Sequence, residues 1–480
     1  MNAERFKTRE EIVSQLQIRH TVLTSDNELI RLEELTPQDC KEVLNRNRLV
    51  FGEEKAENEK RLSTKLTEKM REMGWLDYEK ASGKGHFKFY PKGAIVHSIL
   101  ENVISRFAQQ ELEANPVITP IIFNWSDEQV TGEAGTFYND LYHVQSGADS
   151  EADQQILRFG CDIGVFKLMQ NTELREEQLP VRIYEGGTIF RACKSGEKSN
   201  IQRADSYYLP SIYSFCKNDP TESLKEISFM HKHFSSFLKK LGLEYSLKFE
   251  INESFFNQYR DQIVSILKYD DKPALVNLVS NKRHYFELKS DHVVDNVFKS
   301  FNIQLDDENA TTYDIKYTRK VEENEEKEPC TIIHSSLTSV ERWMLILMND
   351  SMKKNSQELP LWLSPVQLRI ITLDEKYNDF VMNFAKNLSA NNIRVDVDDR
   401  KGKINNKVRK ASNDLVPYTI LWGRNEQQTG VVNLRKRDGN LFPCVLDSLS
   451  EHIKSQVSSS HIDVSISTPP ATKLSKTPSF

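Results

Sequence analysis

The stretch LWLSPVQLRIITLDE, residues 361–375, begins a run in which short apolar segments alternate with helical patterns. Its β-branched part, VQLRIIT, predicts a strand, and a helix is expected through Tyr377–Leu388. The segments NIRVDV, PYTILW and GVVNLR predict further strands, and Ile404–Leu415 predicts a second helix among them. Strands that alternate with helices are typical of a layered α/β unit, here of about 100 residues.

Two basic blocks lie in this α/β unit. The segment Arg400–Lys410 holds six basic residues and no acidic one, and a second block follows a predicted strand at 435–437. Such blocks suit phosphate contacts, and neighbouring side chains can read unstacked bases. A solvated helix face is the alternative, and it stays open. The candidate RNA-contacting residues are Arg400, Lys401, Lys403, Lys407, Arg409, Lys410, Arg435 and Arg437.

Upstream of this unit, strand-like runs separated by turns predict a mostly antiparallel sheet. These runs are residues 181–184, 188–192, 207–213, 274–279, 284–289 and 301–305. Helical patterns occur at Lys225–Leu241 and at Ile95–Leu112, and the latter precedes the extended run PVITPIIF. The acidic run 321–328 is expected to be a solvated loop.

Composition limits the classes of function. The 480 residues predict about three domains, and a hydrophobic content of 38 % is enough for packed cores. No run approaches the ~18 apolar residues of a membrane span, and the charged N-terminus lacks the apolar region of a secretory signal. The six cysteines form no C-x-x-C pair, so a cytosolic protein with reduced thiols is expected. The net charge of −6 does not indicate a nucleic-acid partner, but only a contact face has to be basic.

The composition and the hydrophobic pattern of the sequence change along the chain and predict four regions. Residues 1–73 are a charged, helical appendage with a hairpin expected at Thr21–Glu34, and residues 74–357 are the strand-rich core. Residues 358–457 form the α/β unit, and the Ser/Thr/Pro-rich residues 458–480 are expected to be a disordered tail. The sequence contains no P-loop and no dinucleotide-binding glycine motif.

Three arginines lie in segments suited to a polyphosphate. Arg191 and Arg203 flank a glycine-containing turn at 194–197, and Arg342 follows Ser339, a candidate N-cap of the helix that begins there. A guanidinium forms bidentate, permanently charged contacts with phosphate oxygens. Taken alone, each segment also fits the alternatives, which are surface arginines on a hairpin and an ordinary strand-to-helix junction.

In order along the chain, these segments resemble a class II threonyl-tRNA synthetase, nearest to the archaeal type, from about Trp75 to Val457. LPLWLSPVQ, VDVDDR and RKRDG are similar to the anticodon-binding domain of that family. KGAIVHSILENVISRF with TPIIF resembles motif 1, which forms the family's dimer interface, and Pro120 stands at the motif's proline. The resemblance implies an α+β fold, in which a class II synthetase core has an antiparallel sheet with flanking helices. An α/β anticodon-binding domain follows.

The resemblance also implies roles for single residues. Arg191 and Arg203 stand in a segment similar to motif 2 and Arg342 in one similar to motif 3, so these three would bind ATP, with magnesium. Gln304, in NIQLDDEN, lies on a segment similar to the active-site strand. The implied partners are tRNA, in particular threonine-accepting tRNA, and a second copy of the chain. The implied location is the cytoplasm, with no membrane and no DNA partner.

Several positions depart from the family pattern. The family holds threonine through a zinc ion bound by one cysteine and two histidines. Cys161 and His334 match two of these positions, but Tyr213 stands at the third, and a phenol is a poor ligand at neutral pH. Ser211 replaces the acid that receives the substrate amino group, and Cys193 replaces the motif 2 glutamate. Only a remnant of the metal site, without zinc, is therefore expected.

Two interpretations of function stay open. The first is a threonine–tRNA ligase that activates the amino acid with ATP and transfers it to tRNA. The second is a catalytically inactive paralogue that serves as a tRNA-binding or accessory subunit. Residues 1–73 are too few for the family's editing domain, and the sequence has no H-x-x-x-H signature, so no editing domain is expected.

Overall fold

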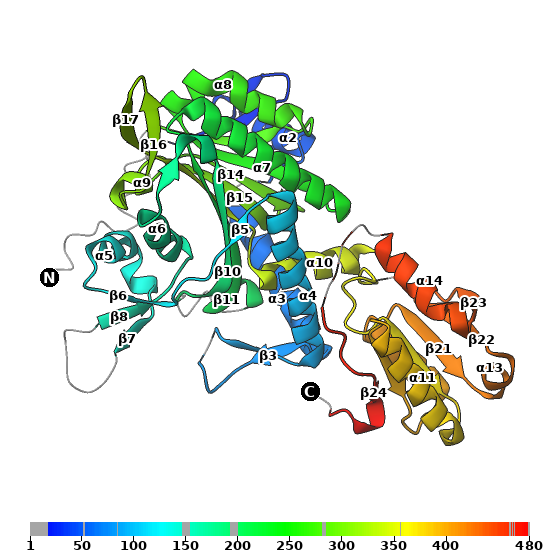
Figure 1. Cartoon of the computed structure of the whole chain (residues 1–480). Coiled ribbons are helices and arrows are strands. Elements are labelled where there is room, and N and C mark those ends of the chain that lie inside the picture. Colours follow the sequence, from blue (N-terminus) through cyan, green and yellow to red (C-terminus); the bar gives the residue numbers. More distant parts are fainter. Residues whose placement is uncertain are drawn as a thin grey trace. The chain divides into compact units, whose positions relative to one another are not determined.

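The computed structural model describes residues 18–50, 53–83, 85–145, 154–192, 200–280, 285–355, 357–459, 462, 464 and 466–478 (Figure 1). The chain forms two compact units. The first comprises Met1–Leu62 and Ile104–Arg342, and the second comprises Ser63–Val103 and Trp343–Phe480. Three helices each have residues in both units: α3 (Glu53–Glu72), α4 (Pro91–Arg106) and α10 (Val340–Lys353). For this reason the units do not coincide with the four regions that the sequence predicts.

A large, mostly antiparallel sheet is the centre of the first unit. Among the described residues, ten strands follow the order β2-β1-β13-β12-β14-β15-β18-β11-β10-β5. Two of the pairs, β12–β13 and β5–β10, run parallel. The predicted antiparallel sheet is confirmed. The bounds are β1 Ile18–Leu23, β2 Leu29–Arg31, β5 Asn115–Pro116, β10 Val181–Phe190, β11 Ser206–Cys216, β12 Tyr245–Asn252, β13 Ala274–Val279, β14 Phe286–Val294, β15 Phe298–Asp306 and β18 Thr331–Ser336.

Helices α7 (Pro220–Lys240) and α8 (Glu253–Lys268) cover one face of this sheet (Figure 1). Helix α7 confirms the helix predicted at Lys225–Leu241, and it begins where the Asp219 carboxylate accepts hydrogen bonds from the first free backbone amides. Phe234 of α7 stacks on Phe301 of β15, with ring centroids 4.4 Å apart. The other short elements of this unit are α2 Pro37–Arg46, η2 Leu32–Glu34, α5 Glu128–Ala134, η4 Gly135–Asp140, α6 Asp162–Gln170, η5 Glu176–Gln178, η6 Ile201–Arg203 and α9 Asn309–Thr312.

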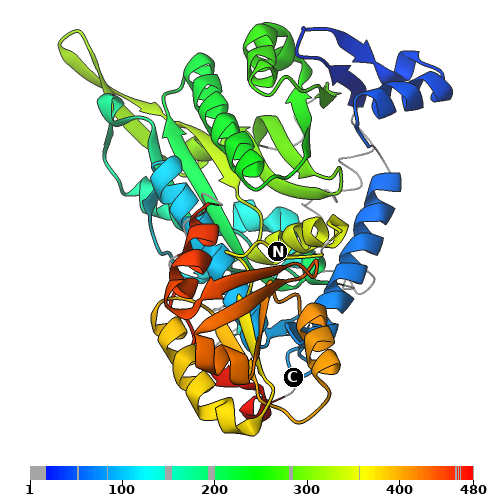
Figure 2. The same ribbon diagram turned by 90° about the vertical axis from the view of Figure 1, so that its right-hand side faces the viewer.

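The acidic run 321–328 is not a loop. It forms the turn and most of the second strand of a hairpin between β16 (Lys316–Val321) and β17 (Asn324–Pro329), which Figure 2 shows as a projecting arm. Arg319 of β16 lies 3.3 Å from Glu326 and 2.8 Å from Glu328, so cross-strand ion pairs offset the repulsion within the acidic strand. Strand β9 (Leu174–Arg175) pairs with β16, and a separate small sheet contains β6 Ile122–Asn124, β8 Gln154–Leu157 and β7 His143–Gln145.

The run PVITPIIF is less regular than predicted. Only its ends are in strands, β5 and β6, and the residues between them have no regular structure. Pro116 and Pro120 lack an amide hydrogen, so a continuous ladder through this run would lose donors. The helix predicted just before it is α4 followed by the π-helical turn η3 (Phe107–Glu111). The side chain of Ile118 is 96 % exposed.

The second unit contains the predicted α/β fold. In the part of the chain that the structure describes, six strands follow the order β23-β22-β21-β19-β20-β24, and β21, β19, β20 and β24 are parallel. The strands and helices predicted from residues 361–436 are confirmed. A separate two-stranded sheet pairs β3 (Leu76–Tyr78) with β4 (Phe87–Phe89). The bounds of the α/β elements are β19 Leu368–Thr372, η7 Glu375–Tyr377, α11 Asn378–Ala390, β20 Val395–Asp398, α12 Ile404–Asn413, β21 Tyr418–Trp422, α13 Arg424–Thr429, β22 Val431–Lys436, β23 Leu441–Val445, α14 Leu446–Ser458 and η8 Leu474–Lys476.

The tail predicted to be disordered contributes to this sheet. Strand β24 (Thr472–Lys473) pairs in parallel with β20, and Ala471 is buried in the core. The amide and hydroxyl of Ser475 donate hydrogen bonds to Asp399, at 2.9 and 2.5 Å. A polar segment can join a sheet because strand pairing uses backbone amides and carbonyls. The edge of β20 offers such backbone groups for pairing. Residues 460, 461, 463, 465, 479 and 480 of the predicted tail, and residues 1–17 of the predicted appendage, lie outside the described residues.

Among the described residues, no helix combines the length and the apolar character that crossing a membrane would need.

Candidate functional site

Four residues predicted to form the active site, Ser211, Tyr213, Gln304 and His334, lie on β11, β15 and β18, which are neighbours in the large sheet. Strand register places Ser211 opposite Glu185, and Tyr213 opposite His334. His334 in turn lies opposite Gln304. Directly opposed residues project to the same face of a sheet. The fold therefore brings these side chains together on one face, although Glu185 and His334 are 149 positions apart in sequence.

His334 is buried between two carboxylates. Its Nε2 lies 2.5 Å from Asp306 Oδ2, and its Nδ1 lies 3.2 Å from Asp162 Oδ1. Burial by itself lowers the pKa of this imidazole, but the charge of Asp306 and the hydrogen bonds to both carboxylates raise it to about 10. At neutral pH both ring nitrogens therefore carry protons, and neither has a free lone pair.

Aromatic rings enclose His334. Tyr285 stacks on it with ring centroids 5.3 Å apart, and Phe166 and Tyr213 lie at 5.3 and 5.4 Å with nearly perpendicular rings. Burial raises the pKa of the Tyr213 phenol well above its usual range, so this group stays protonated.

The donor set at this place does not fit the zinc ion that the resemblance implies. Cys161 is buried, its thiol donates a weak hydrogen bond to the Leu209 carbonyl at 3.9 Å, and burial raises its pKa. A zinc ion needs a thiolate and neutral imidazoles, each with a lone pair toward the metal. Here a phenol stands at one of the three positions, and both ring nitrogens of His334 are already bonded to the carboxylates of Asp306 and Asp162.

Three acidic residues near His334 were missed from the sequence. Asp162 and Asp306 hold the imidazolium, and Glu133 accepts a hydrogen bond from the Tyr313 hydroxyl. Burial raises the pKa of Glu133 to about 8, and the nearby charge of Asp162 adds to this effect. These acids come from three separate elements and form no motif. The only sequence signal is that Asp162 directly follows Cys161 and that Asp306 lies two residues after Gln304.

Two of the three arginines predicted to bind ATP lie close together. The Arg342 amide donates a hydrogen bond to Ser339 Oγ at 3.1 Å, which confirms the predicted N-cap. Its guanidinium Nε has no hydrogen-bond partner among the described residues. Burial lowers the pKa of Arg342, the charge of Glu59 opposes this shift, and the positive charge of Arg203 adds to it. Two guanidiniums whose charges interact suit a polyanion, because its charge would relieve their repulsion.

Arg191 lies beside the His334 cluster. It follows β10, and its Nε donates a hydrogen bond to the Phe159 carbonyl at 2.8 Å. Burial raises the pKa of Asp162, but the hydrogen bond and charge of His334, with the charge of Arg191, lower it below its usual range. Cys193 and the predicted turn at 194–197 lie outside the described residues.

The second unit contains a pocket of about 410 Å³. One side of α12, the strand β21 and the end of β22 line it, and its volume is within the usual range for ligand sites. Three of the predicted RNA-contacting residues are in its wall: Arg409, Arg435 and Arg437. The remaining lining residues are Ile404, Asn405, Val408, Ser412, Val416, Thr419, Leu421 and Lys436.

Lys407 does not face this pocket and is buried. Its ammonium donates hydrogen bonds to the carbonyl oxygens of Thr372 and Asp398, both at 3.3 Å. The sequence grouped Lys407 with the surface cations because basic residues occur on all sides of α12. Only the packed structure shows which side of the helix faces the core. Lys407 therefore does not belong to the candidate RNA-contacting set.

The other predicted cations lie elsewhere on the unit. Lys403 is exposed at the start of α12. The remaining three form ion pairs, Arg400 with Asp398 at 2.7 Å, Lys401 with Glu375 at 3.3 Å and Lys410 with Asp414 at 2.9 Å.

Comparison with known families and relatives identifies both the strand-rich core and the α/β unit. Residues 142–351 match the tRNA synthetase class II core domain (G, H, P, S and T), and residues 367–455 match the anticodon binding domain. The threonine–tRNA ligase of Thermococcus sibiricus is 32 % identical over 457 residues, which cover 91 % of this chain and 69 % of that protein. The Nitrosopumilus maritimus ligase is 31 % identical over 405 residues, covering 81 % and 63 %.

Solved structures share the fold. A structure of the RNA binding domain of threonyl-tRNA synthetase from Cryptosporidium parvum Iowa II has a TM-score of 0.71 at 21 % identity, covering 82 % of this chain and 98 % of that one. Prolyl-tRNA synthetase from Cryptosporidium parvum, complexed with L-proline and AMP, has a TM-score of 0.62 at 13 % identity, covering 82 % and 75 %.

The chain spans 62 % to 69 % of the length of the archaeal threonine–tRNA ligases that it matches. The identity to the Thermococcus sibiricus protein extends through both the core and the α/β unit. The chain therefore belongs to the threonyl-tRNA synthetase family, with a class II synthetase core followed by an anticodon-binding domain.

Proposed function

We propose that this protein binds threonine-accepting tRNA through its anticodon-binding domain and does not activate threonine. The observation that carries the first part is the pocket whose wall holds Arg409, Arg435 and Arg437. The second part is supported by the donor set at Cys161, Tyr213 and His334, which does not fit zinc. The protein would act in the cytoplasm, as a homodimer, where tRNA is charged and used.

The pocket has the chemistry of a site for an unstacked nucleotide. Its apolar residues, Val408 and Leu421 among them, offer a surface for the base, and its three guanidiniums offer bidentate contacts to phosphates. Arg437 is held in place because its guanidinium donates a hydrogen bond to the Ser412 carbonyl. A fixed guanidinium loses less conformational entropy when it binds a phosphate.

The synthetase core keeps groups for a polyphosphate but lacks those for threonine. The charges of Arg203 and Arg342 interact, which supports ATP binding with magnesium. Ser211 stands in place of the acid that would receive the threonine ammonium. Glu185, which lies opposite Ser211, already accepts hydrogen bonds from Arg158 at 2.9 Å and from Thr119. A substrate ammonium would therefore lose its charged partner, at a cost of about 2–5 kcal/mol.

The RNA part is tested by measuring tRNA affinity at several salt concentrations. The wild-type protein is expected to prefer threonine-accepting tRNA over a tRNA with an unrelated anticodon. Arg435→Ala should weaken binding and reduce the salt slope by about 0.7–0.9. Lys386→Ala, which changes an exposed cation on α11 outside the pocket wall and outside the candidate RNA-contacting set, is the matched control and should change affinity less. Equal affinity of the wild-type protein for all tRNAs, together with unchanged affinity in Arg435→Ala, would reject this proposed function.

The catalytic part is tested by threonine-dependent exchange of pyrophosphate into ATP. No exchange above the level without amino acid is expected, while ATP with magnesium should still bind weakly and Arg342→Ala should abolish that binding. The alternative is an active threonine–tRNA ligase, which the retained arginine pair favours. Robust threonine-dependent exchange would establish that alternative and reject the proposal.

A further inference from the structure

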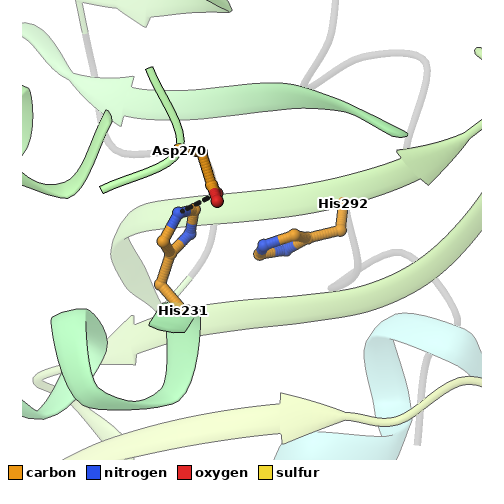
Figure 3. Close-up of side chains that lie close together, drawn as sticks. All are labelled: His231, Asp270 and His292. Carbon is orange, nitrogen blue, oxygen red and sulfur yellow. Dashed lines mark hydrogen bonds and ion pairs between the residues drawn. The ribbon is translucent and has the colours of Figure 1, made fainter. Parts of the chain in front are cut away.

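Two buried histidines and a half-buried aspartate meet on the helix-covered side of the large sheet (Figure 3). His231 comes from α7, Asp270 follows the end of α8, and His292 is on β14. Along β14, Lys289 lies opposite Gln304, so His292, three residues further, projects to the other face. This cluster is therefore separate from the side chains around His334.

The three side chains are held close together. His231 Nε2 lies 2.9 Å from Asp270 Oδ2, and the rings of His231 and His292 have centroids 4.7 Å apart. Ser235, one turn after His231 on α7, donates a hydrogen bond to the same carboxylate oxygen at 2.6 Å and lies 3.3 Å from His292 Nε2. One nitrogen of each ring and one oxygen of Asp270 all lie within 4.8 Å of one another.

The protein atoms leave this cluster incompletely bonded. The Nδ1 atoms of His231 and His292 are buried and have no hydrogen-bond partner among the described residues. Each histidine side chain is at most 1 % exposed. Buried polar atoms in folded proteins nearly always have a partner, so these two nitrogens leave hydrogen-bonding capacity in the cluster that the protein atoms do not use.

The donor set favours a metal ion of the zinc type. Two imidazole nitrogens and one carboxylate oxygen suit Zn²⁺ and its first-row neighbours, whereas Ca²⁺ and Mg²⁺ prefer oxygen ligands. Lys239 binds the other Asp270 oxygen at 2.7 Å, which orients the carboxylate as outer hydrogen-bond partners do in metal sites. The Ser235 hydroxyl lies where a further oxygen ligand could stand. The proton now shared by His231 and Asp270 would leave when the cation enters.

We propose that His231, Asp270 and His292 form a structural site for a zinc-type divalent cation, which ties α7 and the end of α8 to β14. This metal would serve the fold and not the reaction, because the site is buried on the face away from Gln304. It is also distinct from the zinc position of the family, which uses a cysteine.

Elemental analysis and cobalt substitution test the proposal on the full chain. We expect one zinc ion per chain after dialysis against metal-free buffer, and a Co²⁺-loaded protein with the visible bands of a four-coordinate ion. A sulfur-to-cobalt charge-transfer band should be missing, because no ligand is a thiolate. The His231→Asn variant should lose more than tenfold in affinity, since losing even an outer partner costs about 10–100-fold. His233→Asn, two residues away on α7, is the matched control and should retain the metal.

Thermal unfolding of the wild-type protein provides a second measurement if the buried variant does not fold. Zn²⁺ added to metal-free protein should raise Tm by several degrees, and equal Mg²⁺ or Ca²⁺ should not. Failure of the wild-type protein to bind zinc at micromolar concentration would overturn the proposal and leave a water-filled cluster. A bound metal with a cobalt–thiolate band, or one that persists in His231→Asn, would place the metal elsewhere and also overturn it.

Discussion

At the scale of single residues, His334 shows how buried partners set the protonation of a side chain. Its ring is protonated because Asp306 and Asp162 each bind one nitrogen. We expect His334→Asn to lower the free energy of unfolding by about 3 kcal/mol, because it removes the cation that Asp306 faces in the interior. The loss is at the lower end of the usual range, since the amides of Glu308 and Asn309 still donate to Asp306.

Urea unfolding measures this effect. Tyr285→Phe is the control, because it keeps the ring that stacks on His334 and removes only a hydroxyl whose hydrogen bond to Gln304 is long, at 3.4 Å. Its expected cost is under about 1 kcal/mol. Equal costs for the two variants would contradict the ion-pair account.

Lys407 and Arg409 form a natural pair on α12, two residues apart with opposite environments. Arg409 lines the pocket, whereas Lys407 is buried with its ammonium on two backbone carbonyls. Arg409→Ala should weaken tRNA binding about fivefold or more without a loss of stability. Lys407→Met should lower the unfolding free energy by about 1–2 kcal/mol but leave tRNA affinity of the folded protein unchanged.

Titration with tRNA and denaturant unfolding of both variants distinguish the two roles. The assignment would be wrong if Lys407→Met weakened tRNA binding as much as Arg409→Ala while the protein stayed folded.

At the scale of elements, the polar stretch at the C-terminal end of the sequence is part of the six-stranded sheet. Strand β24 covers the edge of β20, Ala471 is buried, and Ser475 donates two hydrogen bonds to Asp399. Removal of residues 466–478 should therefore lower the stability of this unit by about 1–2 kcal/mol. Asp399→Ala should reproduce part of the loss. A truncated protein with unchanged Tm in a calorimetric scan would show that β24 contributes nothing.

A second element, LPLWLSP before β19, depends on a distant residue. Arg394 is buried, and its guanidinium donates hydrogen bonds to the carbonyls of Ser364 at 2.7 Å and Trp362 at 2.8 Å. Burial lowers the pKa of this arginine to about 10. The segment thus owes its conformation to a side chain thirty residues later.

At the scale of the whole molecule, the segment that leads from β5 into β6 exposes apolar side chains. Ile118 is 96 % exposed, Ile121 46 % and Ile122 39 %. Contiguous exposed apolar residues mark interaction sites, and the motif 1 resemblance assigns this segment to a two-fold interface. We expect a dimer by light scattering at micromolar concentration and a monomer for Ile118→Glu. Leu168→Glu, a partly exposed leucine on α6, should leave the dimer intact. A monomeric wild-type protein would reject this interface.

The sequence alone determined the features that depend on short-range patterns. Period-two and helical spacing located the strands and helices of residues 361–436, and the spacing of Ser339 and Arg342 predicted an N-cap that the structure contains. The ordered motifs also identified the family, because their residue types and order are specific. Such patterns are set by interactions between residues a few positions apart, which the linear order displays directly.

Only the tertiary structure decided the environment of individual polar side chains. Asp162 and Asp306 meet His334 from 172 and 28 residues away, and Asp270 meets His231 from 39 residues away. The burial of Lys407 and the strand in the polar tail likewise depend on which surfaces pack against them. The physical reason is that a charged or polar group acquires its protonation state, its partner and its role from atoms that folding brings near, and the local sequence does not encode which atoms those are.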